Sequence, residues 1–245
     1  MRNWSLTATG AVQHKARTSG MFAGMLPASA LRQPFRPSGY EGRCVSRVDA
    51  AAGAALNTAL AAGDLLIRPY VIEDEAQVFA TVRDSLESLS YWPPWCDADY
   101  ALADAQAWIE HCVRVWAERS EFPFGVFQRR TGRFLGGVGL NRLDRRDRSA
   151  NLGYRVGAAH RGQGVALRAA RLAASFGFVE LDLIRIEIVV LPDNRASLRV
   201  AEKLGATRQA LARNRLMFQG KPTAAVIYSL TPDDLAADTP VDRTG

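Results

Sequence analysis

Apolar residues recur at helical spacing in several stretches of the chain. In residues 101–119, Trp108 and Trp116 lie on one face of a helical projection together with smaller apolar side chains, which predicts an amphipathic helix. An acidic run at 73–75 follows a short apolar stretch that begins at Leu65, and acidic side chains favour the first turn of a helix. We therefore expect a short buried strand and then helices at the start of the folded region.

Alternating and β-branched residues predict strands further along the chain. Phe122, Phe124 and Val126 alternate with smaller residues, which predicts a strand. A turn around Gly132 and a second predicted strand at residues 134–140 follow, so the two strands indicate a β-hairpin. Later strands are expected at residues 150–156, 184–191 and 224–230, with a helix after the first of these and another between the last two. This order of elements predicts an α/β fold in which helices cover the faces of a mixed sheet.

Composition separates a basic N-terminal segment from a nearly neutral remainder. The 245 residues include 31 basic and 25 acidic side chains, and 48% of them are hydrophobic. Seven of the basic residues but only two of the acidic ones lie within residues 1–50. We expect a basic, disordered extension over residues 1–62, one domain over residues 63–235 and a flexible tail over residues 236–245. A nearly neutral domain gives no reason to expect a specific nucleic acid as partner.

The cysteines indicate a reducing environment. Cys44, Cys96 and Cys112 are widely separated, form no Cys-x-x-Cys pair and have no histidine at ligand spacing. This pattern argues against a disulfide framework and against a metal site, and it fits a cytoplasmic protein. No apolar run approaches the roughly 20 residues that a membrane-spanning helix needs, so we expect no membrane partner.

A glycine-rich loop lies in the stretch YRVGAAHRGQGVALRAARLAASFGF, residues 154–178. A strand that turns through such a loop into a helix directs backbone N–H groups and the positive end of the helix dipole at one spot, where an anion binds. Gly162 and Gly164 allow a ligand to approach the backbone, and Arg161 can add positive charge. A phosphate ester is the expected ligand. The P-loop pattern is absent, and the dinucleotide-binding pattern fails at Leu167, where a third glycine would stand.

Three segments of the chain agree in order and spacing with one known family. The strand LGYRV, the loop RGQGVA and the later LPDNRAS leading to KLG closely resemble the GNAT superfamily of acetyl-CoA-dependent N-acetyltransferases, in the RimJ/RimL branch that acetylates the N-termini of ribosomal proteins. The resemblance covers about residues 64–232. It implies a mixed, mostly antiparallel central sheet with helices on both faces and central strands that splay apart at the acetyl-CoA site.

The resemblance also implies which residues contact acetyl-CoA. The expected cofactor-binding residues are Arg155, Val156, Arg161, Gly162, Gly164, Val165, Ala166, Asn194 and Ser197. The loop would hold the pyrophosphate, and a backbone N–H near Arg155 or Val156 would stabilise the oxyanion of the tetrahedral intermediate. Asn194 either only caps its helix or also contacts the cofactor. Ser197 either lies near the thioester sulfur or is a helix serine without a chemical role.

The general acid and base are marked less clearly than the cofactor site. Ala201 stands where many GNAT enzymes carry a tyrosine acid, and Leu216 stands where the ribosomal branch can carry a glutamate. Glu187 remains as a base or water-positioning residue, with a structural ion pair as its alternative, so Ser197 and Glu187 are the expected catalytic residues. An α-amine is about one-fifth neutral near pH 7.4 and a lysine about one part in a thousand. A weak base therefore predicts a preference for α-amines or other amines of low pKa.

The acceptor side is expected at the segment YWPPW. Trp92 and Trp95 would form walls of the amine cleft, and a role in closing the end of the core is the alternative. The expected partners are acetyl-CoA and either a peptide or protein N-terminus, a ribosomal protein among them, or a small amine; the oligomeric state, a homodimer included, is left open. Two other hypotheses are a non-catalytic acyl-CoA-binding module or sensor, and a ribosome- or RNA-associated factor tethered by its basic tail.

Overall fold

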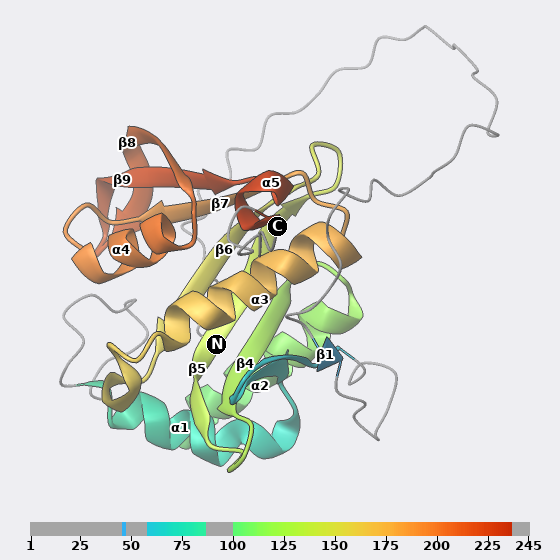
Figure 1. Cartoon of the computed structure of the whole chain (residues 1–245). Helices are drawn as coiled ribbons and strands as arrows, with labels where there is room; N and C mark the ends of the chain where they lie inside the picture. The colour runs from blue at the N-terminus through green and yellow to red at the C-terminus, as the bar shows by residue number, and fades with distance from the viewer. Residues whose placement is uncertain (1–45, 48–57, 87–99, 237–245) are drawn as a thin grey trace, which may run out of the picture.

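A computed structural model of the chain describes residues 46–47, 58–86 and 100–236, which form one sheet flanked by helices (Figure 1). The nine strands lie in the order β1-β2-β3-β4-β5-β6-β7-β9-β8. The strands are β1 (Ser46–Arg47), β2 (Leu60–Ala62), β3 (Leu65–Pro69), β4 (Phe122–Gln128), β5 (Phe134–Asp144), β6 (Ser149–Val156), β7 (Arg185–Val190), β8 (Thr207–Phe218) and β9 (Lys221–Leu230). The helices are α1 (Glu75–Arg83), α2 (Leu102–Ala117), α3 (Val165–Glu180), α4 (Arg195–Lys203) and α5 (Pro232–Ala236), with 3-10 turns at Ile72–Asp74 and Ala158–His160.

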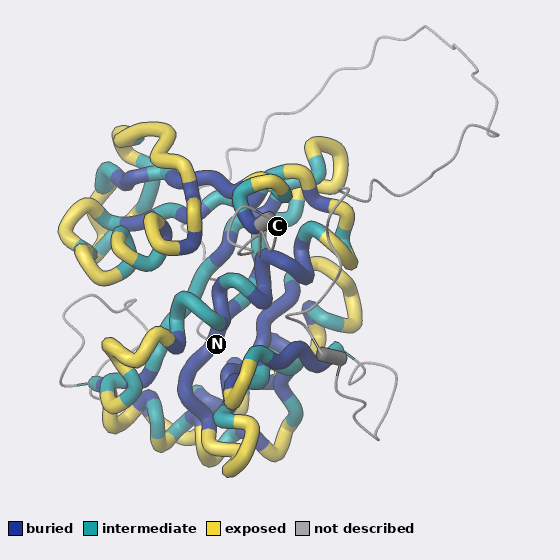
Figure 2. The backbone as a smooth tube through the Cα atoms, viewed as in Figure 1, coloured by how far each residue is buried: buried dark blue, intermediate teal, exposed yellow. Residues whose placement is uncertain are grey.

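Each face of the sheet carries its own hydrophobic core. The strands between the two cores are buried over much of their length (Figure 2). Helix α3 lies across one face, where alternate residues of β4, among them Phe122 and Phe124, are buried with Leu140 and Leu152 of the next two strands. Helices α1 and α2 cover the other face, where Phe127 is buried with residues of both helices. A β-bulge between Val126 and Phe127 shifts the register at that point. The sheet is mixed and mostly antiparallel, as the resemblance implied.

Several sequence-based predictions are confirmed by these elements. The predicted helix 101–119 is α2, and its Trp108 is buried between this helix and the sheet. The predicted hairpin is formed by β4 and β5. Strand β8 was not predicted. Its twelve residues are mostly exposed or half-buried, so the sequence lacks the apolar alternation that marks a strand, and β8 forms because it pairs with β9 along its length.

The ordered sheet begins before residue 63, where we expected the domain to start. Strand β2 pairs with both β1 and β3, and its Leu60 and Ala61 are buried. Asp64, in the turn after β2, accepts a 2.8 Å hydrogen bond from Arg168 of α3, which fixes the turn to the helix. Among the described helices, none has the length and hydropathy to cross a membrane.

The two central strands β6 and β7 are the only neighbours in this sheet that run parallel, and they stay together for only part of their length. Their pairing joins Ser149 with Arg185, Ala150 with Ile186 and Asn151 with Glu187. Beyond this point β6 continues to Val156 and β7 to Val190 without further pairing between them. The strands therefore diverge and leave a gap in the middle of the sheet, as the resemblance implied.

Candidate active site

A cavity of about 910 Å³ occupies the gap between β6 and β7 and is lined by residues of these strands and of α2, α3 and α4. All nine residues expected at the cofactor site line it, which brings together the end of β6, the glycine-rich loop and the start of α4. The sequence motifs are thus neighbours in space although more than thirty residues separate the loop from Ser197. Their role in binding acetyl-CoA stays a prediction at this point.

The glycine-rich loop has the backbone conformation that its composition predicts. Gly162 and Gly164 have φ angles of +74° and +71°, in the left-handed region that side chains rarely adopt. A Cβ atom at either glycine would meet no protein atom within 4 Å, so the space beside them is open to a ligand. Gly164 directly precedes α3, and the first N–H groups of a helix have no partner within the helix. The loop and the helix therefore present N–H donors and the positive end of the α3 dipole to the cavity.

Asn194 and Ser197 are linked to each other at the start of α4. The side-chain oxygen of Asn194 accepts a 3.1 Å hydrogen bond from the Ser197 N–H, so Asn194 caps the helix. Tyr154 of β6 reaches across the gap, and its hydroxyl donates a 3.0 Å hydrogen bond to the Ser197 carbonyl oxygen. Burial raises the pKa of Tyr154, so the phenol stays protonated. The sequence did not indicate this tyrosine as part of the site.

The backbone of β6 offers N–H groups to the gap. Gly157 donates its N–H to the Leu135 carbonyl on β5 at 2.9 Å. Because successive N–H groups of a strand point to opposite edges, the N–H of Val156 points away from β5 and toward the gap, and that of Arg155 points toward β5. Of the two positions expected to stabilise an oxyanion, the geometry thus favours Val156.

The side chain of Arg155 contacts α2: its guanidinium carbon lies 5.0 Å from the ring centroid of Trp108.

Glu187, the expected base, does not line the cavity. One carboxylate oxygen accepts a 3.1 Å hydrogen bond from Arg185, and the other lies 3.6 Å from the Arg215 guanidinium. These contacts favour the structural ion pair over the role as base. Trp92 and Trp95 lie outside the described residues.

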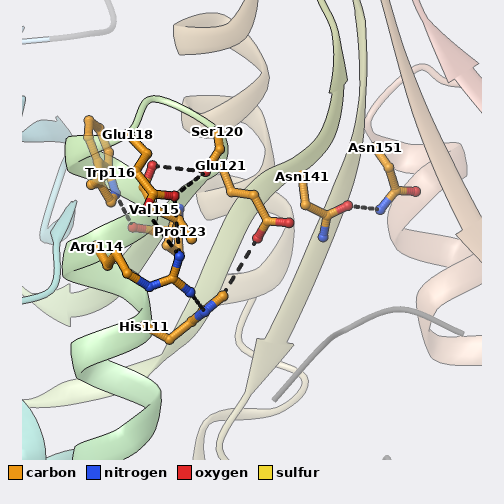
Figure 3. Close-up of polar contacts among 10 residues, drawn as sticks. All are labelled: His111, Arg114, Val115, Trp116, Glu118, Ser120, Glu121, Pro123, Asn141 and Asn151. Carbon is orange, nitrogen blue, oxygen red and sulfur yellow. Dashed lines mark hydrogen bonds and ion pairs between the residues drawn. The ribbon is translucent and has the colours of Figure 1, made fainter. Parts of the chain in front are cut away.

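Polar residues that the sequence did not indicate line the part of the cavity nearest α2. They are Glu121, just before β4, Asn141 and Arg142 of β5, and Asn151 of β6; Figure 3 shows Glu121, Asn141 and Asn151. Burial raises the pKa of the Glu121 carboxyl, although the guanidinium groups of Arg142 and Arg114 act to lower it. The Asn151 side-chain N–H donates a 3.0 Å hydrogen bond to the Asn141 side-chain oxygen. Among the described residues, no group of three or more His, Cys, Asp or Glu is placed to hold a metal ion.

Comparison with known proteins identifies related chains. A protein from Vibrio cholerae, described as a candidate ribosomal-protein-serine acetyltransferase, is 30% identical, covers 71% of this chain and 98% of its own, and superposes with a TM-score of 0.64. RimJ of Mycobacterium smegmatis, solved with a CoA disulfide, covers 71% of this chain and 86% of its own at 22% identity and a TM-score of 0.64, which shows a shared fold.

A relative from Bacillus subtilis is similar over a shorter region. YjcK, named as a probable N-acetyltransferase, is 37% identical over 116 residues, which cover 46% of this chain and 64% of YjcK. The match therefore spans less than two thirds of that relative. Residues 64–207, more than half of the chain and including the loop and the divergent strands, match the family described as Acetyltransferase (GNAT) domain. This chain belongs to the GNAT acetyltransferase family.

Proposed function

We propose that this protein transfers the acetyl group of acetyl-CoA to a primary amine, with an α-amine at a peptide or protein N-terminus, or a small-molecule amine of similarly low pKa, as the preferred acceptor. The observation that carries the proposal is the cavity between β6 and β7, which extends from the N-terminus of α3, a position suited to an anion, to polar residues near α2. One end suits a phosphate-bearing donor and the other suits an amine. A ribosomal protein is an acceptor of this kind, in keeping with the description of the Vibrio cholerae relative.

The residues of the loop fit the pyrophosphate of acetyl-CoA. Two glycines leave open space where side chains would stand, and the N–H groups at the start of α3 point into the same space. Arg161 lines the cavity beside them and adds positive charge. The thioester would then lie along the gap between β6 and β7.

The chemistry of transfer needs an oxyanion donor and a proton for the departing thiolate. In our proposal the Val156 N–H donates to the thioester oxygen as negative charge develops there. Ser197, in the first turn of α4, lies on the opposite side of the gap and supplies the proton to sulfur. Tyr154 holds the Ser197 backbone at 3.0 Å and so fixes the position of this serine.

The proposal is tested by the release of free CoA thiol from acetyl-CoA in the presence of amines. The panel should contain peptides with free N-termini, the same peptides with blocked N-termini, and small primary amines. We expect release that depends on a free α-amine or a small amine of low pKa. Tight binding of acetyl-CoA without release on any amine would instead identify a non-catalytic acyl-CoA-binding module, for which the alanine at position 201 is the observation in favour.

A further inference from the structure

A row of polar side chains crosses four adjacent strands on the face of the sheet that α2 covers. Asn141 of β5 pairs with Asn151 of β6, and Asn151 pairs with Glu187 of β7. Glu121 directly precedes Phe122, which pairs with Leu140, so Glu121 lies beside Asn141 at the other end of the row. Paired residues of neighbouring strands point to the same face, and Figure 3 shows Glu121, Asn141 and Asn151 on neighbouring strands. The row begins at the cavity wall and ends at the point where β6 and β7 separate.

The two glutamates of this row lie in different surroundings. Glu187 is held by Arg185 and Arg215 outside the cavity, so its charge is already compensated. Glu121 lines the cavity, and 26% of its side chain is exposed. No hydrogen bond to the carboxylate of Glu121 is found among the described residues, and the Nε2 atom of His111 lies 4.0 Å from one of its oxygens. Glu121 is thus the carboxylate that can act on a molecule in the cavity.

Arg114 determines which ring nitrogen of His111 carries the hydrogen. Arg114 lies 3.0 Å from Nδ1 of His111, and a guanidinium can only donate, so Nδ1 is the acceptor and Nε2 carries the hydrogen (Figure 3). Nε2 faces Glu121. Burial and the Arg114 charge both lower the pKa of His111, which favours the neutral imidazole, so His111 does not compensate the charge of Glu121.

Other charged groups approach Glu121 from the surrounding elements. Arg114 approaches from α2 and Arg142 from β5, and Arg215 of β8 acts on Arg142 in turn. Both arginines near Glu121 favour its ionised form, but burial outweighs them and raises the pKa of its carboxyl. The carboxylate of Glu121 therefore binds a proton more readily than that of an ordinary surface glutamate.

A second group in the row has an unused hydrogen-bonding capacity. The side-chain N–H of Asn151 is donated to Asn141, but its own side-chain oxygen is buried and has no partner in the described part of the chain. A buried oxygen of this kind is costly unless a donor reaches it. Asn151 lines the cavity, so an N–H of a bound acceptor amine can supply that donor.

We propose that Glu121 is the proton acceptor for the incoming amine and that the side-chain oxygen of Asn151 orients the same amine toward the thioester. This inference rests on the proposed acetyl transfer. An ammonium proton passes to the Glu121 carboxylate, and the neutral amine forms a bond to the acetyl carbon. The C–S bond then breaks, Ser197 donates its hydroxyl proton to the thiolate and takes the second proton from the nitrogen, and amide and CoA thiol leave. Glu121 returns its proton to solvent.

The first experiment compares Glu121→Gln with Glu118→Gln, an exposed glutamate at the end of α2 that lies outside the cavity. Initial rates of thiol release are measured from about pH 6 to about pH 9.5 with one peptide that has a free N-terminus. At pH 7 we expect kcat for Glu121→Gln to fall by about 10² or more, as for loss of a general base. The fall should shrink as the pH approaches the α-amine pKa near 8, because the amine then loses its proton to solvent.

The control should keep the wild-type pH profile. A Glu121→Gln protein with wild-type kcat at pH 7, or with a loss that is the same at every pH, would overturn the proposal. Acetyl-CoA affinity measured on the same sample shows that the variant is folded. Thiol release by the wild type tests the acetyl transfer itself, so a failure of that function and a failure of the Glu121 assignment give different results.

The second variant is Asn151→Leu, which removes the unpartnered oxygen at similar volume. We expect KM for the amine to rise about tenfold, as for one lost hydrogen bond, with acetyl-CoA affinity unchanged. An unchanged KM would contradict the role of Asn151 in orienting the amine.

Discussion

Two glycines with the same backbone conformation allow the phosphate site to be tested against a matched control. Gly164, before α3, has φ +71°, and Gly132, in the turn between β4 and β5, has φ +70°. A Cβ at either position would meet no protein atom within 4 Å. Gly164 lines the cavity and Gly132 does not. Gly164→Val and Gly132→Val therefore introduce the same backbone strain, but only the first places a side chain where the phosphate would bind.

The expected magnitudes follow from this comparison. A side chain in the left-handed region costs about 1–2 kcal/mol, so both variants should lose a similar stability, corresponding to about 2–8 °C in Tm. Loss of one charge-assisted hydrogen bond from a backbone N–H to the phosphate costs a further 1.5–3 kcal/mol or so of binding, a loss of about 10- to 100-fold in acetyl-CoA affinity for Gly164→Val alone. Calorimetric titration with acetyl-CoA measures the affinity. Wild-type affinity in a folded Gly164→Val protein, or an equal loss in both variants, would refute the phosphate site.

Three further predictions concern stability. A chain that begins at residue 58 should keep most of its Tm. A chain that begins at residue 63 lacks β2 and the buried Leu60, so its free energy of unfolding in denaturant should be lower by about 1.5–3 kcal/mol. Equal stability of the two chains would contradict the contribution of β2. Asp74 is 3% exposed and lies 2.6 Å from Arg68, so Asp74→Ala should cost about 3–5 kcal/mol, and a loss below 1 kcal/mol or so would show that the pair is not needed. Folding raises the pKa of Glu121, so the folded chain binds this proton more tightly than the unfolded chain, and the free energy of unfolding should decrease as pH rises above about 4.5. Glu121→Gln should remove that part of the decrease. An unchanged pH dependence of Tm in this variant would contradict the prediction.

The part of the site that could be predicted from sequence is the part built from contiguous residues. The loop at 161–166 and the cap at Asn194 are local structures, since a glycine with positive φ or an asparagine before a helix acts on the next few residues. Their meeting in one cavity was predicted through the family resemblance. Strand β8 was missed because its stability comes from pairing with β9 and its own residues are largely exposed.

The polar row near α2 could not be predicted in this way. Glu121 is one of two acidic residues between α2 and β4, and nothing in its neighbours distinguishes it from the exposed Glu118. Its position beside Asn141, and that of Asn141 beside Asn151, depends on the registers between β4, β5 and β6. Glu187 was expected as a base because Ala201 and Leu216 stand where related enzymes carry an acid or a base. Its contacts with two arginines favour the alternative, a structural ion pair.

The most direct test of the account is the product formed from a peptide that carries both a free N-terminus and an internal lysine. The purified protein is incubated with this peptide and acetyl-CoA near pH 7.4, and the acetylated position is mapped by tandem mass spectrometry over time. We predict acetylation of the α-amine first, because about one-fifth of it is neutral at this pH against about one thousandth of the lysine. Faster acetylation of the lysine, or an acetyl-CoA complex that modifies neither amine nor any small amine, would contradict the proposed function.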